Sequence, residues 1–222
     1  MNRHLTIVTT SDGSHTIKNE STGDTYHSIH GAVQESNHVF IKNGLQYYAE
    51  RFSPVLIKVL EIGFGTGLNV LLTFQNRVQL SVKIEYTSLE PFPLSEEIYT
   101  QLNYNDPGVM LNAIHACEWG KRIELSPDFS LTKIRSEIQS IQLPDNNFDV
   151  VYFDAFAPNS QPEMWTLDVF AKLRAAMTAS SVLTTYCAKG EVKRTLKTTG
   201  FTVESRPGPP GKREMVRALL HE

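Results

Sequence analysis

The sequence contains little cysteine. Its two cysteines, Cys117 and Cys187, lie far apart and belong to no C-x-x-C pair. This arrangement excludes a disulfide framework and a cysteine-based zinc site, and it makes the reducing cytoplasm the expected location. No cluster of histidines, cysteines and carboxylates indicates another metal site, so we expect no metal.

Long apolar runs and an excess of positive charge are also missing. No segment approaches the length of a membrane-spanning helix, and the N-terminal residues MNRHLTIVTTSDGSHT contain no signal-peptide core. We therefore expect no membrane partner. Lysine and arginine number 21 against 24 acidic residues, which gives a formal net charge of −3. Nucleic-acid binding would therefore require a local basic patch.

Apolar residues make up 41% of the 222 positions, which is enough for a sizeable core. From Val55 onward, strand-like and helix-like segments alternate, which predicts an α/β fold with a mostly parallel sheet covered on both faces. The expected strands are 55–62, 82–90, 123–126, 148–156, 181–188, 201–206 and 214–220. The expected helices are 66–78, 93–103, 130–141, 162–177 and 190–200, and 105–122 is expected to be irregular or helical. No helix separates the last two strands, so they should pair antiparallel.

The first 54 residues differ from this alternation. Asp12 and Gly13 lie between the segments LTIVTT and HTIKNE, which predicts a β-hairpin. The segment AVQESNHVFIKNGLQYYAERF has apolar residues at roughly helical spacing. We therefore expect a hairpin and helical extension, residues 1–54, packed on a core, residues 55–222, within one structural domain.

A glycine-rich loop follows the first strand of the expected sheet. The segment LEIGFGTGLNVLL places Gly63, Gly65 and Gly67 between a strand and a helix. Such a turn lets the backbone approach a ligand, and a helix N-terminus attracts negative charge. Leu68 breaks the G-x-G-x-x-G dinucleotide pattern. With Glu61 at the strand end, the spacing instead resembles the S-adenosylmethionine loop of class I methyltransferases; the alternative is a turn that binds nothing.

Three more acids follow expected strands, where ligands of open α/β sheets bind. Glu90 can accept hydrogen bonds from both ribose hydroxyls of adenosylmethionine. The resemblance to class I methyltransferases, which often place an acid or amide near the adenine after the third strand, implies that role for Asp128. Asp154 ends an apolar strand, where an unpartnered carboxylate is costly. The alternative is that these acids bind no ligand. Glu90 would then be a solvated acid at a strand end, Asp128 a surface turn residue, and Asp154 a helix N-cap or a turn acid that bonds local amides.

Longer segments resemble one family. LEIGFGTGLNVLLT, SLEPFPLS, FDAFAPNSQPEMW and GFTVESRPGPPGKREM together resemble the methyltransferase module of MnmC, a family of bacterial tRNA-modifying proteins. The N-terminal segment TYHSIHGAVQESNHVFIKNGL resembles that family as well, so the resemblance covers nearly the whole chain. It implies a class I, Rossmann-like methyltransferase fold with a mostly parallel seven-stranded sheet whose last strand is antiparallel.

The resemblance also implies a reaction. In this family the module uses S-adenosyl-L-methionine to methylate the exocyclic amine of 5-aminomethyl-2-thiouridine at the tRNA wobble position, and S-adenosyl-L-homocysteine is the product. Two-domain members carry an FAD-dependent oxidase module that first exposes this amine. The chain stops at Glu222 without a second glycine fingerprint. We therefore expect no FAD, a likeness to stand-alone members, and functional coupling to enzymes that make the aminomethyl intermediate.

Where this sequence matches the motifs of the family, the resemblance implies roles for individual residues. Those expected to bind the cofactor are Glu61, Gly63, Gly65, Gly67, Asn69 and Glu90, to which the strand position adds Asp128. Asp154 matches the catalytic aspartate, and Phe156 and Pro158 would border the target base. An ordinary aspartate, with a pKa of about 3.9, is a weak base. We therefore expect Asp154 mainly to orient the amine, and to take its proton only if burial raises the pKa.

Candidate tRNA contacts are local basic side chains. Lys212 and Arg213 in the loop PGPPGKR are the best candidates. Others lie by one expected helix or around the last hairpin: Lys189, Lys193, Arg194, Lys197, Arg206 and Arg217. Ordinary solvated charge is the alternative. Trp165 is expected in the core rather than against a base. The rival functions are methylation of a small molecule or a protein, and a non-catalytic adenosylmethionine-binding partner.

Overall fold

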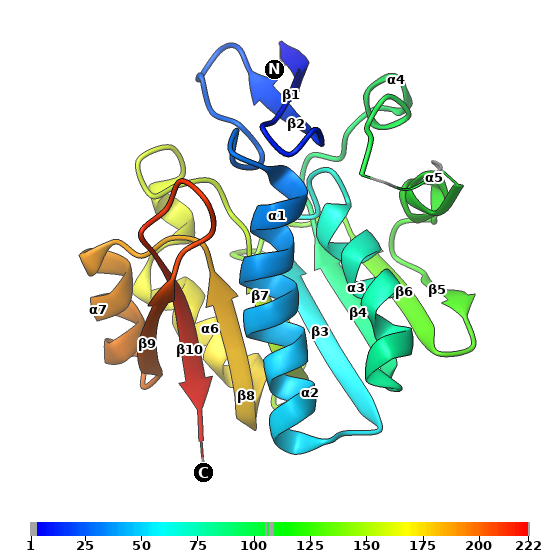
Figure 1. Ribbon diagram of the computed structural model, residues 1–222. Helices are drawn as coiled ribbons and strands as arrows, with labels where there is room; N and C mark the ends of the chain where they lie inside the picture. Colours follow the sequence, from blue (N-terminus) through cyan, green and yellow to red (C-terminus); the bar gives the residue numbers. More distant parts are fainter. Residues whose placement is uncertain (1–3, 105, 107–108, 222) are drawn as a thin grey trace.

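A mixed eight-stranded sheet forms the centre of the protein (Figure 1). The computed structural model describes residues 4–104, 106 and 109–221. The strands follow the order β5-β6-β4-β3-β7-β8-β10-β9. Their bounds are β3 Leu56–Ile62, β4 Lys83–Leu89, β5 Arg122–Ser126, β6 Phe129–Ile134, β7 Phe148–Phe153, β8 Met177–Thr185, β9 Thr202–Pro207 and β10 Glu214–Leu220.

The strand directions bring the ends of the central strands together. Neighbouring strands from β6 through β4, β3 and β7 to β8 are parallel, so their carboxyl ends meet at one edge of the sheet. β10 runs antiparallel to both β8 and β9. The mostly parallel α/β sheet, the final hairpin and the antiparallel last strand are thereby confirmed.

Residues 130–141 do not form the predicted helix. The segment contains most of β6, which pairs with β4 from Ile84–Phe129 to Leu89–Ile134. Apolar residues at positions 131, 134, 138 and 141 have helical spacing, but pairing with β4 and burial of Phe129 outweigh that local pattern. Residues 123–126, predicted as the third parallel strand, lie in β5, which runs antiparallel to β6 at the edge. The sheet therefore has eight strands rather than seven.

Side chains on alternate positions of β7 enter two separate apolar clusters. Val150 and Tyr152 face one cluster, and Val151 and Phe153 face the other. The first cluster lies under α3 (Leu68–Leu80) and the second under α6 (Leu167–Ala176) and α7 (Gly190–Thr198). Because a strand turns successive side chains to opposite faces, the continuous apolar run of β7 is explained by burial on both sides.

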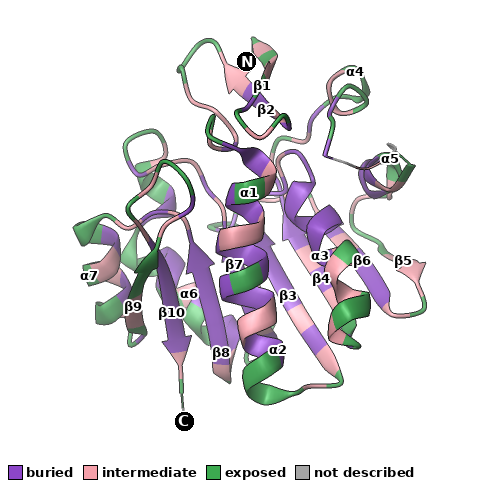
Figure 2. Ribbon diagram, in the orientation of Figure 1, coloured by how far each residue is buried: buried purple, intermediate pink, exposed green. Residues whose placement is uncertain are grey.

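The N-terminal residues pack against the first cluster. β1 (Leu5–Thr9) and β2 (His15–Asn19) form the predicted hairpin, which lies near the carboxyl edge of the sheet (Figure 1). One continuous helix follows, with α1 at Ala32–Ser36, π-helical turns at Asn37–Gln46 and α2 at Tyr47–Phe52. Its buried stripe faces the sheet and its exposed positions face outward (Figure 2).

The remaining helices differ from their predicted bounds. The segment 93–103 contains only the short α4, Glu96–Tyr99, and 105–122 contains α5, Val109–Ala116; Asn105, Pro107 and Gly108 lie outside the described residues. The predicted helix 162–177 begins with a 3-10 turn at Pro162–Met164, and α6 then starts after Thr166. Among the described residues, no helix is long and apolar enough to span a membrane.

Candidate active site

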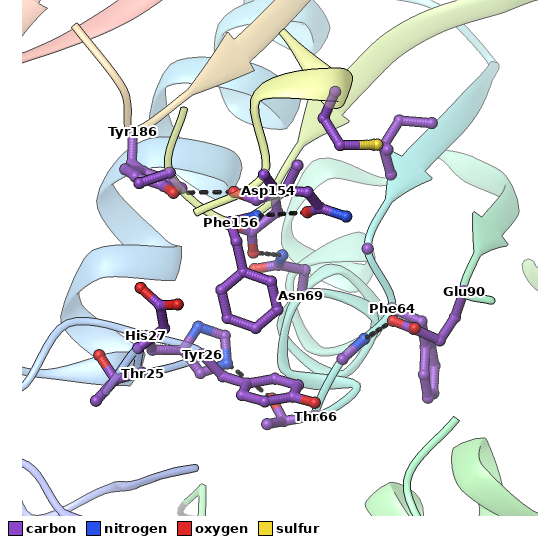
Figure 3. Close-up of a pocket in the computed structure, with 18 of the residues that line it drawn as sticks. Thr25, Tyr26, His27, Phe64, Thr66, Asn69, Glu90, Asp154, Phe156 and Tyr186 are labelled. Atoms are coloured by element: carbon purple, nitrogen blue, oxygen red, sulfur yellow. Dashed lines mark hydrogen bonds between the residues drawn. The ribbon is translucent and has the colours of Figure 1, made fainter. Parts of the chain in front are cut away.

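A cavity of about 1010 Å³ lies at the carboxyl ends of β3, β4, β7 and β8 (Figure 3). Its walls come from the glycine loop after β3, the residues after β4 and β7, the N-terminal segment 23–30, the segments 136–139 and 155–157, and Gln161, Glu163 and Met164. Pockets that hold one small ligand measure roughly 300–1,000 Å³. The cavity therefore has room for a nucleoside-sized ligand and part of a second molecule.

The glycine loop is shaped by a close backbone approach. At Gly63, which has φ +95°, a Cβ atom would lie 2.7 Å from the carbonyl oxygen of Asp154. Only glycine therefore lets the loop lie against the end of β7. Gly65 lines the cavity, and its N–H donates to Glu90 Oε2 at 3.0 Å.

Gly67, in contrast, has a packing role. It precedes α3, and a Cβ atom there would lie 3.1 Å from His115 Nε2 and 3.2 Å from the ring of Phe64. The same imidazole nitrogen lies 2.9 Å from the carbonyl oxygen of Thr66. Helix α5 thus packs against the loop through His115, and Gly67 does not line the cavity.

Glu90 joins the glycine loop to the end of β4 and faces the cavity. Its Oε2 accepts the Gly65 N–H, and its Oε1 accepts the Phe92 N–H at 2.9 Å. A carboxylate keeps further lone pairs beyond two such bonds. Glu90 can therefore also accept hydrogen bonds from a diol in the cavity, which fits the ribose of adenosylmethionine.

Asp154 follows β7 and lies where the cavity meets α3 (Figure 3). Asn69 Nδ2 donates to its Oδ2 at 2.9 Å. Burial, followed by the negative charge of Glu35, raises the pKa of Asp154 to about 7, against the lowering effects of Asn69 and Lys212. A carboxyl group that titrates near neutrality can take a proton from a bound amine.

Glu61 lies beneath the glycine loop and does not line the cavity. It is fully buried, and Ser88 Oγ donates to its Oε2 at 2.6 Å. Burial raises the pKa of Glu61 to about 8. The structure therefore does not bring this acid to the ligand space where the sequence motif placed it.

The N-terminal segment supplies one wall of the cavity. His27 is buried, its Nε2 lies 2.7 Å from Thr66 Oγ1, and burial lowers the pKa of His27 to about 4. The imidazole is therefore neutral at pH 7. Tyr26 meets Phe156 edge-on, with 5.2 Å between the ring centroids. These two rings form an aromatic part of the wall (Figure 3).

The Lys212 side chain points toward the cavity. It does not project outward from the β9–β10 loop, as the sequence had suggested. Its ammonium pairs with Glu35 of α1 and lies 3.9 Å from the centroid of the Tyr186 ring. The Glu35 carboxylate also accepts the Ser28 N–H at 2.7 Å, and the Tyr186 hydroxyl donates to Ala155 O at 2.9 Å. Lys212 thereby links the two ends of the chain at the site.

The structure gathers only part of the predicted site. The predicted residues that line the cavity are Gly63, Gly65, Asn69, Glu90, Asp154, Phe156 and Lys212. Those that do not are Glu61, Gly67, Asp128, Pro158 and Arg213. Pro158 is buried and Arg213 is exposed. Trp165 is a core side chain, as predicted: it packs on Phe153 and donates Nε1–H to Phe156 O at 2.8 Å.

Asp128 lies at the opposite end of the sheet. Its carbonyl oxygen accepts the N–H of Ile84 near the start of β4, and its carboxylate pairs with Arg77 at 2.8 Å. The prediction that Asp128 borders the adenine is wrong because it took 123–126 as the third parallel strand. That strand is β6, and residues 136–139 beyond its carboxyl end line the cavity instead.

Some predicted tRNA contacts are engaged within the protein. Arg217 is 7% exposed, pairs with Glu204 at 2.7 Å and lies 3.6 Å from the centroid of the Tyr47 ring, so its prediction as an RNA contact is wrong. Lys193 pairs with Glu214 at 2.6 Å. The exposed members of the set are Lys189, Arg194, Lys197, Arg206 and Arg213.

Four residues that line the cavity were not predicted from the sequence: Tyr26, His27, Glu35 and Tyr186. Tyr26, His27 and Glu35 lie in the N-terminal segment TYHSIHGAVQES, whose family resemblance was the available signal. Tyr186 lies just after β8, and only its position at a strand end pointed to it.

The fold and the cavity together define a class of enzyme. A glycine loop after the first parallel strand, a ribose-compatible acid after the second and a half-buried acid after β7 surround one space. A sequence model of the family described as S-adenosyl-L-methionine-dependent methyltransferase matches residues 99–221. The chain belongs to this family, and S-adenosyl-L-methionine is its cofactor.

Two curated proteins that resemble the chain carry the same name. The chain is 30% identical over 217 residues to the tRNA 5-methylaminomethyl-2-thiouridine biosynthesis bifunctional protein MnmC of Leptospira interrogans, a match that covers 89% of this chain. A protein of the same name from Pseudomonas fluorescens is 30% identical over 211 residues, or 87% of this chain. The chain spans about a third, 32%, of the length of these curated relatives.

Solved structures show the same fold. MNMC2 from Aquifex aeolicus superposes with a TM-score of 0.82 at 24% identity, covering 98% of this chain and 70% of that one. Spermidine synthase from Thermotoga maritima superposes with a TM-score of 0.63 at 13% identity, covering 97% of this chain and 68% of that one.

Proposed function

We propose that the protein transfers a methyl group to the exocyclic amine of 5-aminomethyl-2-thiouridine at the tRNA wobble position, giving the 5-methylaminomethyl form. The observation that carries the proposal is Asp154, a half-buried carboxyl group with a pKa of about 7 beside the glycine loop. The likeness to MnmC proteins of Leptospira and Pseudomonas supports this choice of substrate.

The cofactor's place follows from the donors and acceptors of the cavity. Adenosylmethionine, when bound, supplies a methyl group carried on a positively charged sulfur. We assign the ribose hydroxyls to Glu90 and the close backbone approach to Gly63 and Gly65. Residues 136–139 are assigned to the adenine end, because they line the cavity just beyond β6.

Asp154 would act on the substrate amine. An alkyl amine is mostly protonated at pH 7 and attacks carbon only after it loses a proton. With a pKa of about 7, Asp154 is matched to accept that proton at neutral pH. The freed nitrogen lone pair forms the new N–C bond while the C–S bond breaks toward sulfur. Asn69 keeps Oδ2 of Asp154 fixed through its 2.9 Å hydrogen bond, so the remaining oxygen can face the amine.

The target base would lie against the aromatic part of the wall. Tyr26 and Phe156 both line the cavity, and a flat base stacks favourably on such rings, by roughly 1–3 kcal/mol in single-stranded nucleic acids. The exposed basic residues of α7 and the β9–β10 loop are assigned to tRNA phosphates. The reaction would take place in the cytoplasm and would depend on enzymes that deliver the free aminomethyl group.

Transfer of a labelled methyl group tests the proposal against its rivals. tRNA from cells that accumulate the aminomethyl nucleoside should be labelled in the presence of the protein and labelled S-adenosyl-L-methionine. Small alkyl amines and bulk protein should not be labelled. Preferential labelling of amines or protein would favour the small-molecule or protein methyltransferase instead. Cofactor binding without product from any acceptor would favour a non-catalytic partner.

A further inference from the structure

Glu35 and Tyr186 form a site for a positively charged nitrogen in the wall of the cavity. The ammonium of Lys212 now fills this site: it pairs with the Glu35 carboxylate and lies 3.9 Å from the centroid of the Tyr186 ring. A carboxylate together with an aromatic face is a favourable environment for an alkyl ammonium ion. All three residues line the cavity. Lys212 thus shows which kind of group this part of the cavity can hold.

Backbone contacts hold the two residues that form the site. Glu35 Oε2 accepts the Ser28 N–H at 2.7 Å, and its Oε1 faces the ammonium. The Tyr186 hydroxyl donates to Ala155 O at 2.9 Å, which fixes its ring beside the loop after β7 (Figure 3). Neither bond involves Lys212. The site can therefore keep its shape when another cation takes the place of Lys212.

The cation in this site is free to leave, whereas the carboxylate is not. The side chain of Lys212 is 31% exposed and that of Glu35 only 7%. A lysine ammonium is carried on a flexible four-carbon stem, so it can move into solvent without a change in the fold. A buried carboxylate that loses its partner is strongly destabilising. Departure of Lys212 therefore requires that another cation pair with Glu35.

The charges around Asp154 give a reason for this exchange. Lys212 lowers the pKa of Asp154 and Glu35 raises it, so a cation in this site interacts with both acids. Bound S-adenosyl-L-methionine carries a positive sulfur, and an aminomethyl group is a second cation at pH 7. With Lys212 in place, three cations would face the carboxylates of Glu35 and Asp154. Without Lys212, two cations face two carboxylates.

We propose that Glu35 and Tyr186 bind the ammonium group of the substrate, and that Lys212 fills this site in the free protein and leaves it when the substrate enters. Lys212 then competes with the amine for the site and does not help to bind it. The displaced ammonium is released toward the surface of the β9–β10 loop, where a tRNA phosphate can pair with it. The inference rests on the proposed function for the identity of the ligand, a nucleoside with an aminomethyl group.

This arrangement divides the handling of the amine between two acids. Asp154, with a pKa of about 7, takes one proton from the ammonium and becomes neutral. Two N–H bonds remain, and the Glu35 carboxylate accepts a hydrogen bond from one of them while the nitrogen lone pair attacks the methyl carbon. An amine that carried a carboxymethyl group would bring a further carboxylate against Glu35. The site therefore favours the free aminomethyl group.

Binding of free nucleosides tests the exchange without tRNA. The probes are 5-aminomethyluridine and its neutral counterpart 5-hydroxymethyluridine, measured by calorimetry with protein saturated with S-adenosyl-L-homocysteine. Lys212→Met should bind the aminomethyl nucleoside about tenfold more tightly than wild type, because the site is no longer occupied. Glu35→Gln should bind it about tenfold more weakly, as for a lost hydrogen bond to a charged group.

Controls separate the exchange from a general change in the protein. The affinity for 5-hydroxymethyluridine should stay close to that of wild type in both variants, because this nucleoside has no ammonium group. Lys83→Met removes an exposed cation at the start of β4, at the other end of the sheet, and should bind both nucleosides like wild type. If Lys212→Met does not fold, Lys212→Gln replaces it, since its amide can donate to Glu35 without a positive charge.

Weaker binding of 5-aminomethyluridine to the Lys212 variant than to wild type would overturn the inference, because Lys212 would then be part of the amine site. Unchanged affinity in Glu35→Gln, or no binding to either wild type or the Lys212 variant, would overturn it as well. These results leave the proposed reaction open to its own test on tRNA. Conversely, failure of wild-type protein to methylate tRNA, with nucleoside affinities as expected, would refute the proposed function and leave the ammonium site in place.

Discussion

Replacement of Asp154 by asparagine should increase stability while it removes activity. Burial raises the pKa of this carboxyl group from its ordinary value of about 3.9 to about 7. The folded protein therefore holds a proton that the unfolded chain releases, so stability falls as pH rises from about 3.9 to about 7. About three pKa units at 1.36 kcal/mol each give a loss of at most about 4 kcal/mol above pH 7.

Asp154→Asn removes this titration and keeps the shape of the side chain. Its amide oxygen can still accept the Asn69 N–H. In urea denaturation, the variant should match wild type near pH 4 and exceed it by up to about 4 kcal/mol near pH 8. Methyl transfer should fall by roughly 10²-fold or more, the scale of a lost acid–base group. Cofactor affinity should survive.

An exposed aspartate provides the matched control. Asp145→Asn makes the same chemical change at a solvent-exposed position, and its unfolding free energy should follow the wild-type pH dependence. Parallel curves for wild type and Asp154→Asn across the whole pH range would refute the reasoning, because Asp154 would then titrate as an ordinary surface acid.

Three other variants test separate parts of the site. Gly63→Ala places a Cβ atom 2.7 Å from the carbonyl of Asp154, so cofactor affinity measured by calorimetry should fall by about tenfold, as for backbone strain of roughly 1–3 kcal/mol. Lys212→Met removes a charge that lowers the pKa of Asp154, so the acid limb of the pH–rate profile should move to higher pH; an unmoved limb would contradict this coupling. Arg206→Ala with Arg213→Ala removes two exposed cations, so the salt dependence of tRNA binding should flatten by about two units of slope or less without a change in cofactor affinity; an unchanged slope would direct the search to α7.

The parts of the fold that follow from repeated local patterns could be predicted from the sequence. The helix after the glycine loop and the strand before Asp154 have long apolar patterns that admit one reading. Residues 130–141 show the limit of local patterns, because their apolar spacing is helical although residues 130–134 belong to an inner strand of the sheet, between β4 and β5. That single error moved the expected adenine site from the residues after Ile134 to Asp128, at the other end of the sheet.

The site was predictable where a loop or strand end alone positions the residue. Gly63, Glu90 and Asp154 are of this kind. Lys212 was expected to project outward from its loop. Contacts with Glu35 and Tyr186, which are tertiary contacts, turn it toward the cavity instead. Those partners come from distant parts of the chain, and no local pattern relates them.

Nucleoside mass spectrometry tests the central claim most directly. Purified tRNA that carries 5-aminomethyl-2-thiouridine is incubated with the protein and S-adenosyl-L-methionine, then digested to nucleosides. We predict that this nucleoside alone gains one methyl group, that 5-methylaminomethyl-2-thiouridine appears in its place, and that Asp154→Asn leaves it unmodified. An unchanged wobble nucleoside, with wild-type protein shown to bind the cofactor, would contradict the proposed substrate.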